Sequence, residues 1–423
     1  MSRTPAIRFK GFTDPWEQRK LNRFIFVTND KNVDGMFARE DVLSVSREEG
    51  VVNQIEFQGR SFAGADVSVY GILRHGDIVY TKSPLRANPY GIIKTNKGCS
   101  GIVSTLYATY RARSGVDPNF VQCYFDQDAR LNNYLHPLVN KGAKNDMKVS
   151  AENAITGEVT FPGYDEQRRI ASLLASLDNL ITLHQRKYDK LVTLKKALLD
   201  KMFPRDGACV PELRFAGFTD PWEQRKLGEL SEIVGGGTPD TNNPDYWDGD
   251  IDWYSPAELG EQVYADTSQR RITREGYENS SAKMLPAGRT ILFTSRAGIG
   301  TTAILRRSAC TNQGFQSLVL RDEVNIYFVY SMSARIKAYA ESKASGSTFL
   351  EISGKQLAEM ELMLPNRAEQ DAIGDFFTSL DNLITLHQRK RTKRRYCGSL
   401  LGNSVSWVSW PNSLKVKDTQ RRI

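Results

Sequence analysis

The chain has 423 residues, enough for two or three domains that each bury their own core. It contains no run of about 18 apolar residues and no leading basic-then-apolar segment, so we expect a cytoplasmic protein without a membrane span or signal peptide. Five scattered cysteines without CxxC spacing argue against a zinc site or a disulfide framework. They are Cys99, Cys123, Cys209, Cys310 and Cys397.

The formal net charge of +8 is concentrated at one end of the chain. Residues 389–423 hold ten Lys or Arg and one acid, Asp418, which leaves 47 basic and 48 acidic residues elsewhere. The body of the protein is therefore about neutral. Any case for nucleic-acid binding must rest on local charge.

Two segments of the chain occur twice. GFTDPWEQRKL at 11–21 returns at 217–227, 206 residues later, and SLDNLITLHQRK at 176–187 returns at 379–390, 203 residues later. This period indicates the duplication of a whole domain, because solenoid repeats are only about 20 to 50 residues long. The segments between the repeats scarcely resemble each other, so one frame carries two different inserts. This layout suits a protein that reads two unlike targets.

The inserts, about 22–161 and 228–364, are rich in short β-type runs broken by Gly and Pro. Examples are residues 77–80, 289–293 and 316–320. We expect the fold class α/β (α+β), with two mixed α/β domains at 1–165 and 205–368.

Long amphipathic helices are expected to follow each insert, at 166–204 and 369–395. Apolar residues recur there every three or four positions, which predicts a coiled-coil seam. The two helices can pack antiparallel about a pseudo-twofold axis, with the equivalent histidines as polar residues that set the register rather than as metal ligands. The predicted seam and subunit interface consists of Leu174, Leu177, Ile181, His184, Tyr188, Leu191, Leu380, Leu383, Ile384 and His387.

The two copies diverge after the second HQRK. Gly398, Gly402 and Pro411 do not continue the seam of the first helix, so we expect residues 396–423 to be a disordered tail. Our hypothesis is that recombination or a shifted reading frame replaced the native ending.

Each insert contains a long window without any acid, at 78–116 and 279–321, and each window holds six basic residues. In a neutral body these windows are candidates for contact with phosphates and base edges. The alternative is a solvated strand face that lacks acids by chance. The candidate DNA-binding residues are Lys82, Ser83, Arg86, Asn88, Tyr90, Lys94, Lys97, Ser295, Arg296, Thr301, Thr302, Arg306, Arg307, Asn312 and Gln313.

Motifs for chemistry are weak. Residues 298–303 match GxGxxA, but the next residues favour a strand rather than a phosphate-binding helix, so we expect a glycine-rich hairpin. Residues 243–246 resemble the NPPY loop of amino-methyltransferases, except that Asp245 replaces the second Pro. We predict no catalytic residue and no metal site.

The repeated GFTDPWEQRKL, the Pro-x-x-x-Glu-Gln at 162–167 and 365–370, and the repeated SLDNLITLHQRK resemble the specificity subunit of type I restriction-modification enzymes. The resemblance implies a non-catalytic subunit whose two target-recognition domains each read one half of an asymmetric bipartite site on double-stranded DNA. It also implies that the helices set the spacing and dock two methylation subunits, to which restriction (motor-nuclease) subunits are added. S-adenosylmethionine, ATP and Mg would then bind to these partners and no cofactor to this chain.

Two other interpretations stay open. The chain could be an inactive or silent specificity subunit, disabled by its altered C-terminus. It could also be a stand-alone DNA-binding protein or a coiled-coil scaffold.

Overall fold

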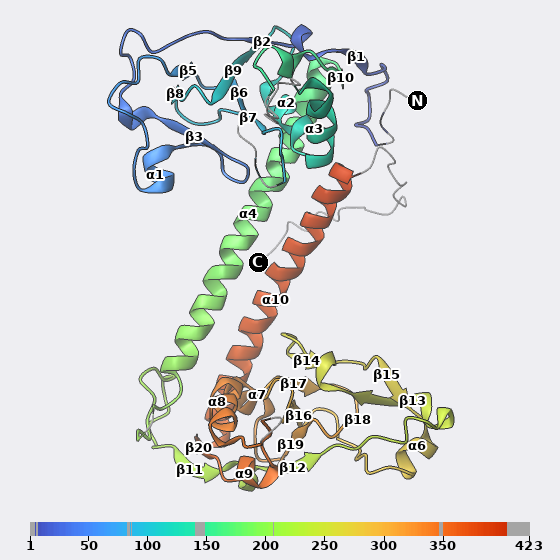
Figure 1. The fold of residues 1–423 in the computed structure, drawn as a ribbon. Helices are drawn as coiled ribbons and strands as arrows, with labels where there is room; N and C mark the ends of the chain where they lie inside the picture. The colour runs from blue at the N-terminus through green and yellow to red at the C-terminus, as the bar shows by residue number, and fades with distance from the viewer. Residues whose placement is uncertain are drawn as a thin grey trace. The chain divides into compact units, whose positions relative to one another are not determined.

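The computed structural model describes residues 5, 7–82, 85, 87–139, 149–205, 207–346 and 350–403, with side chains up to residue 388 in the last range. The chain forms two compact units, Met1–Leu183 with Arg391–Ile423, and His184–Lys390 (Figure 1). Within the described ranges, no helix is both long and apolar enough to cross a bilayer.

The repeated frame forms the same two-stranded ladder in both units. β1 (Glu17–Lys20) pairs antiparallel with β10 (Glu158–Phe161), and β11 (Glu223–Lys226) pairs in the same way with β20 (Glu361–Leu364). The register is identical, because the first residue of β1 or β11 lies opposite the last residue of its partner. One repeated sequence therefore selects one register against two partner strands of different sequence.

The inserts share a topology that their sequences do not reveal. In the first unit, β2 (Ile25–Val27), β9 (Tyr107–Ala112), β6 (Ile78–Thr81) and β7 (Ile93–Thr95) form an antiparallel sheet in that order. In the second unit, the corresponding order is β12 (Ser231–Gly235), β19 (Gln316–Leu320), β16 (Thr290–Phe293) and β17 (Thr302–Leu305). The second sheet gains a parallel edge strand, β14 (Tyr264–Ala265). The duplication thus includes the inserts.

Successive side chains of a central strand point to opposite faces of the sheet, and the second unit has a separate core on each face. Ile291 and Phe293 of β16 pack with α7 (Ile326–Ser331) and α8 (Ser333–Lys343), whereas Leu292 faces a separate core with Leu305 and Tyr254. On this second side lies the small sheet of β15 (Arg270–Ile272), β13 (Trp247–Tyr254) and β18 (Ala309–Thr311). Helices therefore cover one face of the main sheet and β-structure the other.

The first unit has the same layers. Ile78 and Tyr80 of β6 face the core that contains α2 (Pro118–Phe125) and α3 (Asp128–Leu135). Val79 faces β3 (Leu43–Ser46), β5 (Gly71–Leu73) and β8 (Gly101–Val103). The remaining short elements are β4 (Gly50–Asn53), α1 (Gln54–Gln58), α5 (Leu227–Leu230), α6 (Arg274–Glu278) and α9 (Gly354–Ala358).

The two long helices extend differently from the prediction. α4 runs over Tyr164–Lys201, close to the expected 166–204, and α10 runs over Arg367–Asn403. The expected end of α10 at 395 is wrong, because Gly398 and Gly402 weaken a helix by about 1 kcal/mol each without breaking it. Residues 404–423 of the predicted tail lie outside the described residues.

An arginine fixes the start of each long helix. Arg8 forms two hydrogen bonds with the buried Glu166 of α4, both 2.7 Å, and Arg214 forms two of the same length with the buried Glu369 of α10. The parallel N–H groups of a guanidinium match the two carboxylate oxygens. Each pair ties the start of its long helix to the segment that precedes the repeated GFTDPWEQRKL.

The adjacent glutamine joins each long helix to a short one. Gln167 donates to the Pro162 carbonyl at 2.8 Å and accepts from the backbone N–H of Asp117, the N-cap of α2. Gln370 accepts in the same way from the backbone of Asn325, the N-cap of α7, at 3.0 Å. The Glu-Gln pair therefore has the same two structural roles in both units.

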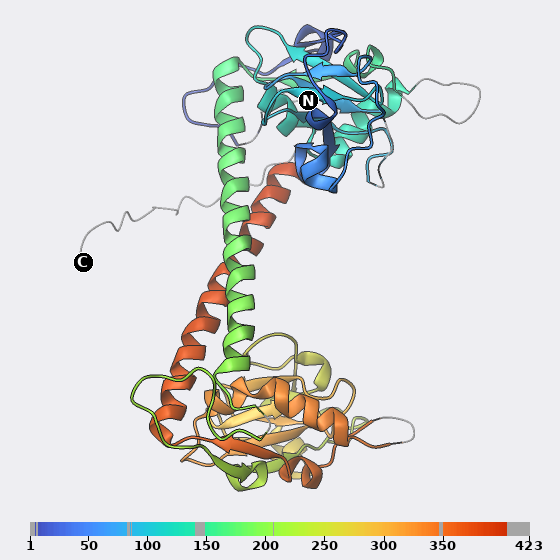
Figure 2. The same ribbon diagram turned by 90° about the vertical axis from the view of Figure 1, so that its left-hand side faces the viewer.

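Within the second unit, residues 184–201 of α4 pack antiparallel to the first part of α10, as both views indicate (Figures 1 and 2). The Nδ1 atoms of His184 and His387 lie 2.9 Å apart, so the predicted meeting of these histidines is confirmed. Leu380 is buried, but Leu383 is 48% exposed and lies off the helix-helix seam, so only its predicted place in a subunit interface stays open. The seam follows Leu380, Ile384 and His387, whose spacing of four and three keeps them on one face.

The other predicted seam residues are partly buried. Leu174, Leu177 and Ile181 lie in the first unit, and Leu191 packs against the core of the second. Tyr188 is also in the second unit and partly buried.

Candidate nucleic-acid interface

Three loops of the second unit meet at one edge of its main sheet. The backbone N–H of Ser295 donates to the Gly314 carbonyl at 2.8 Å, and that of Gly237 donates to the Thr311 carbonyl at 2.8 Å. The hydroxyl of Thr238 donates to Oε1 of Gln313 at 2.6 Å. These bonds join residues 236–240, 294–301 and 312–315 into one surface, which we call the loop cluster.

The β16–β17 connection within the loop cluster is held by its own hydrogen bonds. The Thr294 hydroxyl donates to the Gly298 carbonyl at 2.6 Å and accepts from the Thr301 backbone at 2.9 Å. Gly300 has φ +84°, and a Cβ there would lie 2.4 Å from Cγ of Lys337 on α8. The expected glycine-rich hairpin is confirmed, since β17 begins at Thr302, directly after the loop.

The loop cluster presents Arg296 as its principal cationic side chain. Arg296 is partly exposed, and no acid in the described part of the chain lies within ion-pair distance of it. Gln313 is exposed and Asn312 partly so. A cation without a partner beside amide groups can bind a phosphate and the edge of a base.

Other candidates in this part of the chain differ in exposure. Thr301 and Thr302 are partly exposed. Ser295 is fully buried, and its hydroxyl lies 3.3 Å from Oε1 of Glu351, so its prediction as a surface contact is wrong. Ser295 instead connects the loops through its backbone.

Arg306 and Arg307 lie at the other end of β17, away from the loop cluster. Arg306 lies 3.3 Å from Asp266 and stacks 3.8 Å from the ring centre of Tyr264. Arg307 is 3.9 Å from the buried Asp252. Both side chains are exposed but have acidic neighbours, which lowers their value as free phosphate ligands.

In the first unit, the β6–β7 connection is the topological equivalent of the loop that carries Arg296. It holds Lys82, which is partly exposed and has its Nζ 3.3 Å from the Thr105 carbonyl, and Tyr90, which is partly buried against His136. Ser83 and Arg86 lie outside the described residues. The sequence-predicted sites of the two inserts thus begin at equivalent positions of one topology.

Two further candidates of this unit are buried. Asn88 donates to Oδ1 of Asp128 at 3.0 Å, and Lys94 places its Nζ 2.7 Å from Oδ1 of Asp126. Their prediction as DNA contacts is wrong, because neither side chain can reach a ligand without breaking a polar contact that compensates its burial.

The acid-free windows are not free of acids in three dimensions. Arg111 pairs with Asp77 at 3.0 Å, and Arg289 pairs with Asp322 at 2.9 Å. The hydrogen bond to Asp77 also raises the pKa of Arg111. Acids that precede or follow the windows therefore neutralise part of each basic set.

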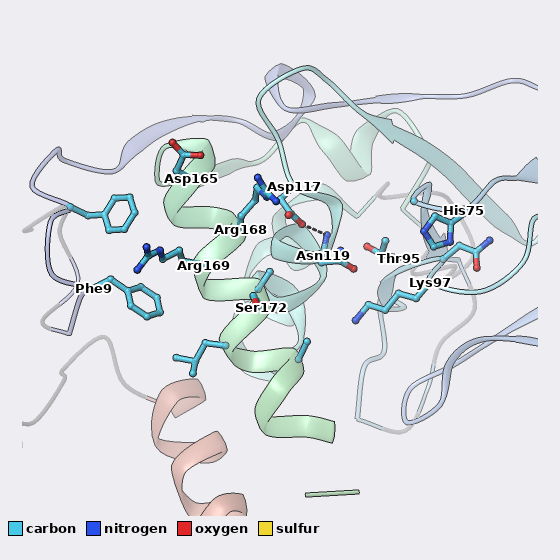
Figure 3. Close-up of a pocket in the computed structure, with 16 residues that line it drawn as sticks. Phe9, His75, Thr95, Lys97, Asp117, Asn119, Asp165, Arg168, Arg169 and Ser172 are labelled. Atoms are coloured by element: carbon cyan, nitrogen blue, oxygen red, sulfur yellow. Dashed lines mark hydrogen bonds between the residues drawn. The ribbon is translucent and has the colours of Figure 1, made fainter. Parts of the chain in front are cut away.

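Lys97 lies apart from Lys82, in an open groove of about 1060 Å³ within the first unit. Figure 3 shows Arg168 and Arg169 of α4 along one part of this groove and Lys97 with His75 along another. Asp117 and Asp165 also line it, so its charge is mixed. The groove is thus no continuous basic track.

The described side chains offer few groups for catalysis. In the ranges that the structure describes, no cluster of three or more His, Cys, Asp or Glu is arranged to hold a metal ion. Burial raises the pKa of the Cys123 and Cys310 thiols to about 12, so neither is a thiolate at neutral pH. Asn243 accepts a hydrogen bond from the backbone of Asp245 at 3.1 Å and caps a short 3-10 turn.

The two units share one sheet topology on a repeated frame, so the chain is an internal duplication. Residues 219–393 of the second half match the family model described as "Type I restriction modification DNA specificity domain". The resemblance read from the repeated motifs is thereby confirmed.

Curated relatives carry the same description. The chain is 36% identical over 167 residues to the type I restriction enzyme MjaIX specificity subunit of Methanocaldococcus jannaschii, which covers 38% of each chain. It is 31% identical over 173 residues to the EcoR124I/EcoR124II specificity subunit of Escherichia coli, over 38% of this chain and 42% of that one. The matches thus span about two fifths of these relatives.

One solved structure extends the likeness to the whole fold. The crystal structure of the type I restriction-modification system S subunit from M. genitalium matches with a TM-score of 0.59 over 94% of this chain and 97% of that chain. The two sequences are 15% identical. The predicted α/β (α+β) fold class with two long helices is confirmed.

Proposed function

We propose that this chain is the DNA-specificity subunit of a type I restriction-modification complex and that it performs no chemistry itself. Each insert would read one half of an asymmetric bipartite site on double-stranded DNA. Methyl transfer from S-adenosylmethionine and the ATP- and Mg-dependent reactions would belong to methylation and restriction subunits.

The observation that carries this proposal is the shared topology of two inserts with different sequences. The β6–β7 and β16–β17 connections occupy the same position in the two sheets. They present different side chains there, with Lys82 and Tyr90 in one copy and Arg296 in the other. Equivalent placement with unlike chemistry is what recognition of two different half-sites requires.

Docking of two methylation subunits is supported by exposed leucines that recur in both helices. Leu180 and Leu183 of α4 are 39% and 46% exposed, and the repeat-equivalent Leu383 and Leu386 of α10 are 48% and 46% exposed. Pairs of leucines that stay in water in both copies favour a partner that covers both alike. The expected stoichiometry is therefore two methylation subunits per chain, and the helices would also set the half-site spacing.

The decisive experiment is methylome sequencing of a host that expresses this chain with its cognate methylation subunit, compared with a host that expresses the methylation subunit alone. We expect a bipartite methylated motif only when this chain is present. A soluble chain that co-purifies with the methylation subunit but yields no motif would contradict the proposal.

The contacts are tested by binding to DNA that contains the motif at several salt concentrations. Lys82→Ala and Arg296→Ala should each weaken binding and reduce the slope of log K against log salt by about one unit, as expected for one lost phosphate contact. Arg225→Ala is the matched control, because it removes the same charge from frame strand β11. Unchanged affinity and slope in both loop variants would exclude these side chains from the interface.

A silent subunit is the second candidate, favoured by the divergence of α10 after Lys390. It predicts a folded chain that neither co-purifies with the methylation subunit nor directs methylation. Co-purification without a methylated motif would instead point to a defect in DNA recognition.

A further inference from the structure

Two amide side chains of the loop cluster are held by contacts to their oxygens. Oδ1 of Asn312 accepts from the backbone N–H of Gly314 at 2.9 Å, and Oε1 of Gln313 accepts from the Thr238 hydroxyl at 2.6 Å. Because the oxygen and the nitrogen of an amide are attached to the same planar carbon, each contact also fixes where the NH2 group lies. Both side chains are therefore oriented before any ligand arrives.

The NH2 groups of these amides have no acceptor of their own. Among the residues that the structure describes, none accepts a hydrogen bond from Nδ2 of Asn312 or from Nε2 of Gln313. Gln313 is exposed and Asn312 partly so. The two side chains thus offer hydrogen-bond donors to a ligand, while their oxygens are engaged with the loops.

The charged residues of the loop cluster fit the same pattern. Arg296 carries only donors, and it lies beside the loop of the two amides, since the adjacent Ser295 donates to the Gly314 carbonyl. Asp240 is the one acid in the sequence of the three segments. Its Oδ1 accepts from the backbone and the side chain of Asn242 at 2.9 and 3.2 Å, so this carboxylate is engaged within its own turn.

We propose that the loop cluster reads a guanine in the half-site of the second unit, with Asn312 and Gln313 donating to its major-groove edge. This inference rests on the proposed function and refines its recognition site. Guanine is the base that shows two acceptors, N7 and O6, and no donor in the major groove. Thymine shows one acceptor beside a methyl group, and cytosine shows a donor.

Adenine is disfavoured by the way Gln313 is held. An amide that reads adenine accepts from N6 through its oxygen while it donates to N7. The Thr238 hydroxyl already donates to this oxygen in Gln313, and the backbone of Gly314 donates to the oxygen of Asn312. Arg296 would contact the phosphate next to the guanine, so charge and base recognition come from different side chains.

The test combines a base analogue with isosteric variants of the full chain in complex with its cognate methylation subunit. 7-Deazaguanine lacks the N7 acceptor but keeps its pairing with cytosine, and it replaces each guanine of the methylated motif in turn. We expect binding to become about fivefold weaker at one guanine of one half-site, as for one lost hydrogen bond.

Gln313→Glu and Asn312→Asp keep the acceptor for Thr238 or Gly314 but remove the NH2 group. Each should weaken binding to unmodified DNA by about fivefold or more. In one of the two variants, 7-deazaguanine should cause no further loss, because the donor to N7 is already gone. Gln224→Glu is the matched control, since it adds the same charge at an exposed amide of frame strand β11 and should bind like the wild type.

Two results separate this inference from the function on which it rests. A methylated motif in which no guanine responds to 7-deazaguanine, or a response that both amide variants retain in full, would overturn the inference and leave the proposed function intact. A complex that binds no specific DNA would refute the proposed function and the inference with it.

Discussion

Replacing Glu369 by Gln tests the contact that fixes the start of α10. The Glu369 side chain is 1% exposed and that of Arg214 is 12% exposed, and the two groups share two hydrogen bonds of 2.7 Å. The substitution keeps the shape of the side chain but leaves a largely buried guanidinium without its counter-charge. Removing one partner of a buried ion pair costs about 3 to 5 kcal/mol, and we expect the lower value because part of Arg214 reaches solvent.

The assay is hydrogen exchange resolved by peptide, because a two-unit chain need not unfold in a single step. Glu369→Gln should accelerate exchange in the core of the second unit and leave the first unit unchanged, and Glu166→Gln should do the reverse. Glu359→Gln is the matched control, since its partner Lys226 is 47% exposed and Glu359 itself is 65% exposed. We expect no measurable effect from the control.

The result that would refute this reasoning is a Glu369→Gln variant that exchanges like Glu359→Gln. Burial would then not determine how much these ion pairs contribute to the stability of the unit. The repeated Glu-Gln at the start of each helix would need a role outside the folded chain.

Three further substitutions probe other parts of the structure. Phe203→Ala removes a ring that is 2% exposed and packs against three other aromatic rings, so we expect a loss of about 3 to 5 kcal/mol in chemical denaturation of the second unit. Gly236→Ala would place a Cβ 2.0 Å from the Asn312 carbonyl, so it should separate two loops of the loop cluster, speed exchange at 312–315 and weaken DNA binding. For Asp178, burial raises the folded-state pKa above 3.8, so the destabilisation is absent below the unfolded pKa and complete above the folded one. Asp178→Asn should therefore raise the melting temperature at neutral pH but not in acid.

Repeats and periodicity were sufficient to predict the frame. The identical segments predicted two units, and the seam spacing predicted helices that meet at His184 and His387, 2.9 Å apart in the structure. These features depend on neighbours in sequence or on an exact internal copy. The arginines at positions 8 and 214 could also have been found, because each stands three residues before the repeated glycine at the same offset of 206.

The candidate site was predicted less well, because its chemistry depends on contacts that are distant in sequence. Lys94 stands in a window without acids, yet its partner Asp126 lies on the connection from α2 to α3, 32 residues away. Asn88 and Ser295 have residue types suited to base edges, but tertiary packing buries both. The common sheet order of the inserts could not be read either, since it is preserved through burial patterns rather than through identical residues.

Identity between the two copies falls into two groups with different physical causes. Glu166 and Glu369 are identical and buried, and their ion pairs explain why each copy keeps a glutamate at that position. The leucines at 180, 183, 383 and 386 are also identical but stay 39% to 48% exposed, so burial does not account for their identity. An apolar residue repeated on the surface of both copies is best explained by a partner that treats both copies alike. The hairpin loops differ between the copies, which is expected if each meets a different DNA sequence. Leu183→Glu and Leu386→Glu should therefore each release one methylation subunit while leaving DNA affinity intact, and mass photometry of the assembled complex can count the subunits that remain.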